Sequence, residues 1–219
     1  MAAVTDRPRR RLDAVRRPQI LATAVDLVRE KGLWNVRIVD VAKGAGVSPA
    51  SVVYYFGSKE QLFAHAITEA DDSFYRSLES ELAAQDRAID RLACLMVRSS
   101  ESDWILWMDL WVYTRRHPET ASAQSRFHQR WRATIADVIR YGQSTDEWGD
   151  CEAEEVAQRL SALTDGLAVH MVLGEPDHTP PRYVDMTLVA ASQELGCNLE
   201  DLRQAATKCP LQTQGEAPL

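Results

Sequence analysis

Apolar residues recur along most of the chain with the 3.6-residue spacing of an α-helix, and no segment shows the alternation typical of a strand. Proline near the beginning and glycine at the end delimit the first helix, as Pro18 and Gly32 show. The pattern predicts helices over 17–31, 38–44, 47–56, from 58 through 78, and near 86–100, 103–117, 118–142, 152–173 and 180–195. We therefore expect an all-α protein of about nine helices.

Two of the short helices, joined by a tight turn at Gly46, have the spacing of a helix-turn-helix. Val41, Val47 and Val52 supply the buried side, and Ser48 is placed as the N-cap of the second helix. In such a motif the second helix enters the major groove of DNA. Its outward side carries short side chains and two aromatic hydroxyls, from Ala50, Ser51, Tyr54 and Tyr55.

The charge is unevenly distributed along the 219 residues. Residues 1–60 carry 11 Lys and Arg against 6 Asp and Glu, a net charge of +5. Since the whole chain has a net charge of −7, the remaining residues carry −12. A basic head on an acidic body is expected when only one part meets a polyanion. The predicted domains are a flexible basic arm (1–14), a helix-turn-helix domain (15–60), a larger helical domain (61–208) and a disordered tail (209–219). The arm is either a DNA contact or a solvated tail.

Residues 17–67 resemble the N-terminal domain of TetR-family transcriptional regulators. The resemblance rests on the helix that ends at Gly32, the run V-D-V-A-x-x-A-G-V-S over 39–48, the Tyr-Phe pair at 55–56, and Gly-Ser-Lys-Glu over 57–60. It implies DNA-facing roles for Ser48, Ala50, Ser51, Tyr55 and Lys59, and we add Arg37 and Tyr54, which the family pattern supports less directly.

Two positions depart from the family pattern. Arg37-Ile38 stands where the family often has Thr, and Arg37 can compensate with a charge-assisted phosphate contact. Val53 stands where a phosphate-contacting Tyr is common, so it can offer DNA only an apolar contact. For Tyr54 the alternative is that its ring packs inward and holds the helices together.

Residues 100–196 more loosely resemble the C-terminal domain of BetI-like members, through W-x-x-W-x-x-x-W over 104–111, His-Pro-Glu over 117–119 and Asp-Gly-Leu-Ala over 165–168. The resemblance implies effector binding and dimerisation. Aromatic and polar residues on three helices are candidates for the effector site, with core packing as the alternative: Trp104, Trp107, Met108, Trp111, Phe127, His128, Trp131, Asp165 and His170. The Trp residues and the acidic body would suit a lipophilic or cationic effector.

The helix near 152–173 is apolar on more than one side, which favours burial against both the protomer core and a partner, and the helix near 180–195 is its natural companion. The residues expected at a four-helix dimer interface are Leu160, Leu163, Leu167, Val184, Leu188 and Ala191. Such a homodimer would place two recognition helices about 34–36 Å apart, which matches a pseudo-palindromic operator.

These patterns predict a homodimeric transcriptional repressor that a small-molecule effector releases from a double-stranded DNA operator. An activator or an effector-independent DNA-binding protein of the same fold is the alternative. The four cysteines lack metal-ligand spacing, the histidines are scattered, and no HExxH or cofactor motif occurs, so we expect no enzyme, metal or cofactor. We expect reduced thiols, no membrane span and a cytoplasmic protein.

Overall fold

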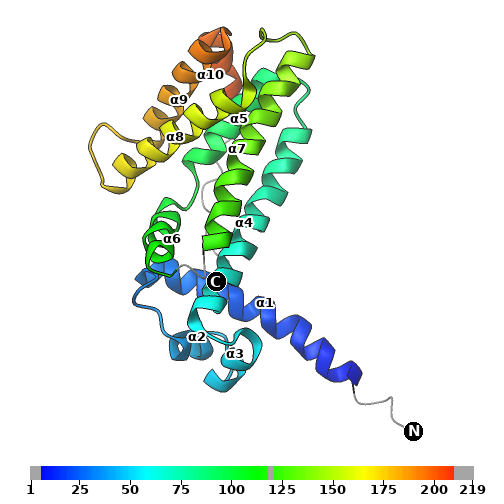
Figure 1. Cartoon of the computed structure of the whole chain (residues 1–219), viewed down its shortest axis with the longest axis vertical. Helices are drawn as coiled ribbons and strands as arrows, with labels where there is room; N and C mark the ends of the chain where they lie inside the picture. The colour runs from blue at the N-terminus through cyan, green and yellow to red at the C-terminus, as the bar shows by residue number, and fades with distance from the viewer. Residues whose placement is uncertain (1–5, 118–120, 210–219) are drawn as a thin grey trace. The chain divides into compact units, whose positions relative to one another are not determined.

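A computed structural model describes residues 6–117 and 121–209, with the side chains of 16–117 and 125–209. Within these residues the chain forms ten α-helices and no strand (Figure 1), which confirms the all-α prediction. The helices are α1 (Asp6–Lys31), α2 (Ile38–Gly44), α3 (Pro49–Phe56), α4 (Lys59–Ala83), α5 (Ala88–Ser100), α6 (Trp104–Arg116), α7 (Ala121–Ser144), α8 (Ala153–Val172), α9 (Pro180–Leu195) and α10 (Leu199–Lys208).

The ends of the chain differ from the prediction. The first helix begins at Asp6 and contains Pro18 in its interior, so residues 6–14 are helical where an arm was expected. Residues 6–14 are rich in Arg and carry no apolar stripe, so periodicity gave no sign of a helix there. α10 was missed because it buries little, mainly Leu202 and Ala205. Residues 1–5, the side chains of Arg7–Arg11 and the tail 210–219 lie outside the described residues.

Contacts between residues divide the chain into two units, at positions that differ from the expected boundary near residue 60. The first unit contains the residues up to Phe74 together with Ile105–Arg126, and the second contains Tyr75–Trp104 and the residues from Phe127 onward. α4, α6 and α7 therefore each contribute to both units. The sequence placed α6 wholly in the second unit because its attachments to the first depend on residues distant in the chain.

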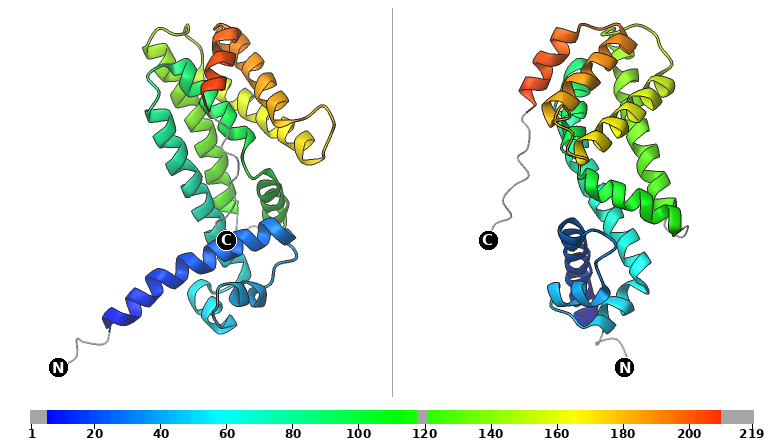
Figure 2. Two further views of the ribbon diagram at one scale, coloured as in Figure 1. Left: turned by 180° about the vertical axis from the view of Figure 1, so that it is seen from behind. Right: turned by 90° about the vertical axis from the view of Figure 1, so that its left-hand side faces the viewer.

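The first unit packs α2 against α1 and α3 (Figure 2). Val41 and Val52 are buried, as predicted, whereas Val47 is only half-buried. α6 is attached through the backbone N–H of Leu33, which donates to Oδ2 of Asp109 at 2.8 Å. Near the other end of α6, the hydroxyl of Tyr113 donates to Oε1 of Glu60 at 3.4 Å. These bonds connect α6 both to the segment after α1 and to the beginning of α4.

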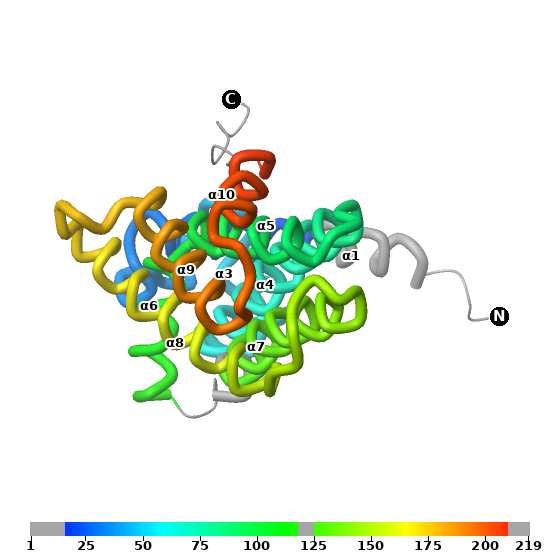
Figure 3. Tube along the Cα trace, turned by 90° about the horizontal axis from the view of Figure 1, so that it is seen from above, coloured from blue at the N-terminus to red at the C-terminus, as the bar shows by residue number. Residues whose placement is uncertain are grey.

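The second unit is built around α5, since every residue from Leu92 to Ser100 is buried. α9 and α10 contact α5, and α10 lies alongside both helices in Figure 3. α8 runs antiparallel to α9, and two hydrogen bonds of 2.7 Å join the guanidinium of Arg159 to the carboxylate of Glu194. No helix in the described part of the chain is long and apolar enough to cross a bilayer.

Two cysteines that are 115 residues apart in sequence meet in the second unit. The Sγ atoms of Cys94 and Cys209 lie 2.9 Å apart in a hydrogen bond, and both residues are free cysteines. The hydrogen bond with Cys209 and burial together raise the pKa of the Cys94 thiol. This contact attaches the end of α10 to α5.

A glycine inside α7 makes room for a tryptophan beyond the helix end. Gly142 is buried, and a Cβ atom added there would overlap the indole ring of Trp148. That ring is held in place because its Nε1–H donates to the carbonyl oxygen of Ile139 at 2.9 Å. The sequence suggested that Gly142 ends the helix, but α7 continues to Ser144.

We predict that Gly142→Ala lowers the free energy of unfolding by about 1–3 kcal/mol, because a well-packed core cannot absorb an added methyl group. In an exposed helix the same change would stabilise the protein by about 1 kcal/mol. Urea denaturation measures the difference. Gly149→Ala is the matched control, since a Cβ there meets no atom within 4 Å. An increase in stability for Gly142→Ala would contradict the packing argument.

Candidate DNA-binding surface and effector site

The turn between α2 and α3 has the geometry of a helix-turn-helix. Gly46 adopts a φ of +64°, which L side chains rarely adopt, and the N–H of Val47 then donates to the carbonyl of Ala42 at 2.9 Å. Ser48 is the N-cap of α3, and its Oγ accepts from the backbone N–H of Ser51 at 3.1 Å. The first turn of α3 is thereby fixed by short local bonds.

The buried and exposed sides of α3 divide as the sequence indicated. Val52 and Phe56 are buried, and the guanidinium carbon of Arg17 lies 5.3 Å from the Phe56 ring centroid. Tyr54 is 72% exposed, so the alternative in which its ring packs inward is wrong. Of the other predicted DNA contacts, Ser48 and Ala50 are exposed, and Ser51, Tyr55 and Lys59 are half-buried.

Arg37 is exposed to solvent, and it also forms hydrogen bonds with Asp40. Its Nε donates to Oδ2 of Asp40 at 3.2 Å, and its backbone N–H donates to the same oxygen at 3.0 Å. The hydrogen bond from the guanidinium lowers the pKa of the Asp40 carboxyl. Arg37 therefore occupies the N-cap position of α2, where the Asp40 carboxylate accepts from its backbone N–H, and a phosphate contact would share its guanidinium with Asp40.

The nine residues predicted for the effector site divide between the two units. Trp107, Met108 and Trp111 belong to the first unit, where Trp107 is buried and the other two are half-buried. The remaining six belong to the second unit. His170 stands apart from these, because it is exposed and its Nδ1 lies 2.9 Å from Oε1 of Glu175.

Within the second unit, hydrogen bonds hold two aromatic residues on Ser99. The indole N–H of Trp104 donates to the Ser99 carbonyl at 3.0 Å, and the hydroxyl of Tyr183 lies 3.1 Å from the Ser99 Oγ. The two rings are 6.4 Å apart between centroids. Burial raises the pKa of the Tyr183 hydroxyl. Sequence reasoning did not select Tyr183, although it is the tyrosine inside the apolar pattern of α9.

A carboxylate lies close to these rings. Burial raises the pKa of Asp165, and the charge of His128 lowers it in part. The charge of Asp165 also raises the pKa of Tyr183, so this carboxylate interacts electrostatically with side chains of both α7 and α9. The ring of His128 lies edge-on to Phe127 at 5.6 Å. We name the second-unit set the aromatic–carboxylate group: Trp104, Phe127, His128, Trp131, Asp165 and Tyr183.

Trp131 is on the same side of α7 as Phe127, one turn later, and both are buried. Its Nε1–H is buried without a hydrogen-bond partner among the described residues. A buried donor left unsatisfied costs about 1–3 kcal/mol. An acceptor atom on a bound molecule would recover that free energy.

The predicted dimer residues need correction. Leu160, Leu167, Leu188 and Ala191 are buried within a single chain, so they are core residues and not the surface that a partner contacts. Only two of the six, Leu163 and Val184, are half-buried. Periodicity cannot tell which apolar side of a helix faces its own core and which faces a partner.

The exposed second helix of this motif defines a helix-turn-helix DNA-binding protein. The chain belongs to the TetR family: the family model described as "Bacterial regulatory proteins, tetR family" matches residues 20–66, and that of the "BetI-type transcriptional repressor, C-terminal" matches residues 87–196. The prediction of a transcriptional regulator and not an enzyme is therefore confirmed.

Curated relatives include the transcriptional regulator BetI of Agrobacterium fabrum, 26% identical over 168 residues that cover 74% of this chain and 79% of that protein. BetI of Rhizobium meliloti is 25% identical over 172 residues, covering 76% and 82%. Among solved structures, a putative regulator from Saccharomonospora viridis in complex with choline is 29% identical, with a TM-score of 0.75 and coverage of 82% and 96%.

We predict that Asp165→Asn raises the free energy of unfolding at pH 7. Because burial raises the folded-state pKa of Asp165, the folded chain binds more protons than the unfolded chain above the ordinary Asp value of about 4, and stability falls as the pH rises through that range. The stability advantage of Asp165→Asn over the wild type should shrink in urea titrations as the pH is lowered from 7 toward the ordinary Asp pKa of about 4.

The matched control is Asp137→Asn on α7, whose side chain is 74% exposed and which should change stability by less than about 0.5 kcal/mol. A wild-type protein that is more stable than Asp165→Asn at pH 7 would show that the carboxylate is compensated by a cation in the folded chain.

Proposed function

We propose that this regulator is a homodimeric repressor of a pseudo-palindromic operator, released by a small organic cation that carries a quaternary ammonium group. The observation that carries the effector assignment is Asp165. Its carboxylate is partly withdrawn from water, lies close to Tyr183 and His128, and has no ion-pair partner among the described residues. Such a carboxylate is stabilised when a cation binds beside it.

The chemistry of the surrounding residues supports a quaternary ammonium group. Aromatic faces attract cations that cannot donate hydrogen bonds, and the aromatic–carboxylate group combines such faces with one acidic side chain. The unsatisfied Nε1–H of Trp131 suits a hydroxyl or carboxylate oxygen at the other end of the molecule. The choline complex of the Saccharomonospora viridis relative supports the same class of ligand.

The exposed side of α3 supports binding to the major groove. The N-terminal part of the helix presents Ser48 and Ala50, which are too short to keep the backbone away from DNA, and Tyr54 stands clear of the protein surface. Lys59 follows at the beginning of α4 and supplies a positive charge for a phosphate group.

One side of α8 is exposed to solvent within the single chain, and this side supports the proposed dimer. Ala162, Gly166 and Val169 are exposed at helical spacing, and two small residues among them allow close approach of a second helix. The half-buried Leu163 and Val184 lie at the edges of the buried sides of α8 and α9. A second copy that covers this surface is the arrangement typical of a two-fold symmetric regulator.

Helix α6 is one continuous helix that contributes residues to both units, and it can therefore couple the effector site to the DNA-binding domain. Its first residue, Trp104, is in the aromatic–carboxylate group, and further along Asp109 and Tyr113 bond to Leu33 and Glu60. Effector and DNA would then oppose each other through one coupling free energy, of about 1–3 kcal/mol, which acts equally in both directions.

We predict that choline binds the purified protein in calorimetric titrations and that Asp165→Asn and Trp131→Leu each weaken the binding by at least about tenfold. Asp137→Asn should bind as the wild type does. The neutral isostere 3,3-dimethyl-1-butanol should bind more weakly than choline, because it lacks the charge. Equal affinity for the two compounds would contradict a cationic effector.

The release of DNA is tested separately, on an operator selected from random duplexes with the purified protein. Saturating choline should weaken operator binding by about 5–150-fold, the range of typical coupling energies. Unchanged operator affinity would contradict repression relieved by this class of effector.

We predict different salt responses for two DNA-facing residues. Lys59→Ala should weaken operator binding and reduce the slope of log K against log salt by about one, because it removes one phosphate contact. Tyr54→Ala should weaken binding about tenfold without changing that slope, because it removes no charge. Fluorescence anisotropy at several salt concentrations measures both. The matched control is Lys208→Ala on α10 in the second unit, and a loss as large as that of Lys59→Ala would contradict the assigned surface.

A further inference from the structure

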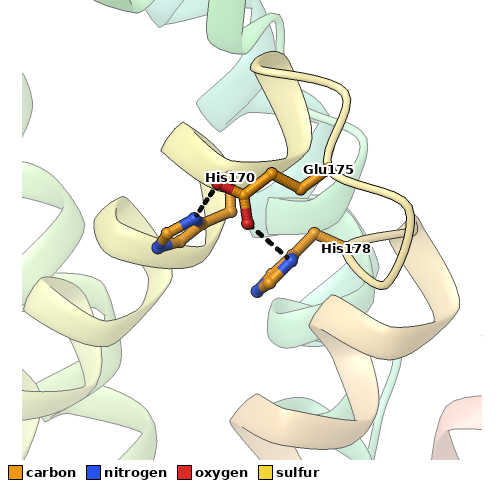
Figure 4. A group of neighbouring side chains, drawn as sticks. All are labelled: His170, Glu175 and His178. Carbon is orange, nitrogen blue, oxygen red and sulfur yellow. Dashed lines mark ion pairs between the residues drawn. The ribbon is translucent and has the colours of Figure 1, made fainter.

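Three side chains at the connection between α8 and α9 converge on one point (Figure 4). His170 is in the last turn of α8, Glu175 lies in the turn that follows, and His178 comes just before α9. Their nearest ligating atoms all lie within 4.8 Å of one another. Within the described residues this is the one group of three or more His, Cys, Asp and Glu side chains that is arranged to hold a metal ion.

The backbone explains why these side chains meet. Gly174 adopts a φ of +70°, and its N–H donates to the carbonyl of Met171 while the N–H of Glu175 donates to the carbonyl of His170. This pair of bonds is a Schellman motif, which turns the chain back over the end of its helix. The N–H of His178 then donates to the carbonyl of Glu175 at 2.9 Å. Successive hydrogen bonds thus fix all three residues relative to one another.

Two distances between the side-chain atoms are close to those between ligands of a tetrahedral ion. Nδ1 of His170 lies 2.9 Å from one carboxylate oxygen of Glu175, and Nδ1 of His178 lies 3.3 Å from the other. Ligands bound at about 2.0–2.1 Å in a tetrahedron are about 3.3 Å apart from each other. Both imidazoles point their Nδ1 atoms at the carboxylate, and the rings are stacked with centroids 4.6 Å apart.

One of these nitrogens lacks a hydrogen bond. Nδ1 of His178 is buried and makes no bond of acceptable geometry, although the carboxylate of Glu175 is near. The side chains of His170 and Glu175 remain 47% and 43% exposed. An ion could therefore enter from solvent, use the nitrogen that has no hydrogen bond, and keep water as its fourth ligand.

We propose that His170, Glu175 and His178 form a binding site for a divalent transition-metal ion of the zinc class, one per chain. Two imidazole nitrogens and one carboxylate suit zinc, copper, nickel or cobalt, whereas magnesium and calcium prefer ligand sets made of oxygen. The bound ion would clamp the end of α8 to the beginning of α9. This site is separate from the aromatic–carboxylate group and does not depend on the proposed effector.

The test uses the full chain, reduced and stripped of metal, titrated with Zn²⁺ against a chromophoric chelator. The wild type should bind one ion per chain, and His170→Gln, Glu175→Gln and His178→Gln should each weaken that binding at least tenfold. Asp177→Asn is the matched control, because it removes an exposed carboxylate from the same turn that is not a member of the group. It should bind Zn²⁺ as the wild type does.

Two further measurements separate this site from the cysteines. Co²⁺ bound at nitrogen and oxygen should show visible ligand-field bands without the near-ultraviolet sulfur charge-transfer band, and Zn²⁺ should raise the Tm of the wild type but not of His178→Gln. Zn²⁺ binding that survives all three substitutions, or that disappears when the thiols are alkylated, would overturn the proposal. The absence of one-to-one binding in the wild type would also overturn it.

Discussion

The complete burial of the second half of α5 is the constraint on which the second unit depends. A buried helix must satisfy every polar group it carries, and Ser99 does so by receiving Trp104 on its carbonyl and Tyr183 at its hydroxyl. These bonds set the beginning of α6 and the inner side of α9 at the same time. Two members of the aromatic–carboxylate group, Trp104 and Tyr183, are thus held by one buried serine.

The same packing gives Asp165 an environment that is unfavourable for a carboxylate. A half-buried acidic side chain without an ion-pair partner reduces stability, and groups of this kind are concentrated at functional sites. A cationic ligand of the class proposed above would compensate this carboxylate. Trp131 belongs to the same group, and its buried N–H likewise lacks a partner among the described residues.

Local patterns predicted the DNA-binding head well, because its structure depends on short-range rules. The Gly46 turn, the Ser48 cap and the buried Val41 and Val52 all follow from residues within a few positions of one another. The exposed position of Tyr54 did not follow, since either direction of its ring agreed with the helical period. For Arg37 the sequence suggested a phosphate contact but did not reveal its ion pair with Asp40, which competes with such a contact.

The second unit was predicted less completely, because its wrong predictions all concern contacts between segments that are distant in the chain. Leu160, Leu167, Leu188 and Ala191 were expected at a dimer interface, but they are buried within a single chain. α5 and α10 both contact α9, and α10 was not expected at all. The division of α6 between two units likewise depends on Asp109 reaching Leu33, 76 residues away. Sequence spacing carries no information on such partners.

The amino-acid sequence alone determined the helical class, the helix-turn-helix and the membership of a regulator family, because periodicity, capping and turn chemistry act between neighbours in the chain. Only the tertiary structure decided which apolar sides of the helices form the core and that Cys94 contacts Cys209. It also placed His170 beside Glu175 and His178 and not with the other residues predicted for the effector site. These outcomes depend on which distant segments pack together, and packing is settled by the burial of the whole chain.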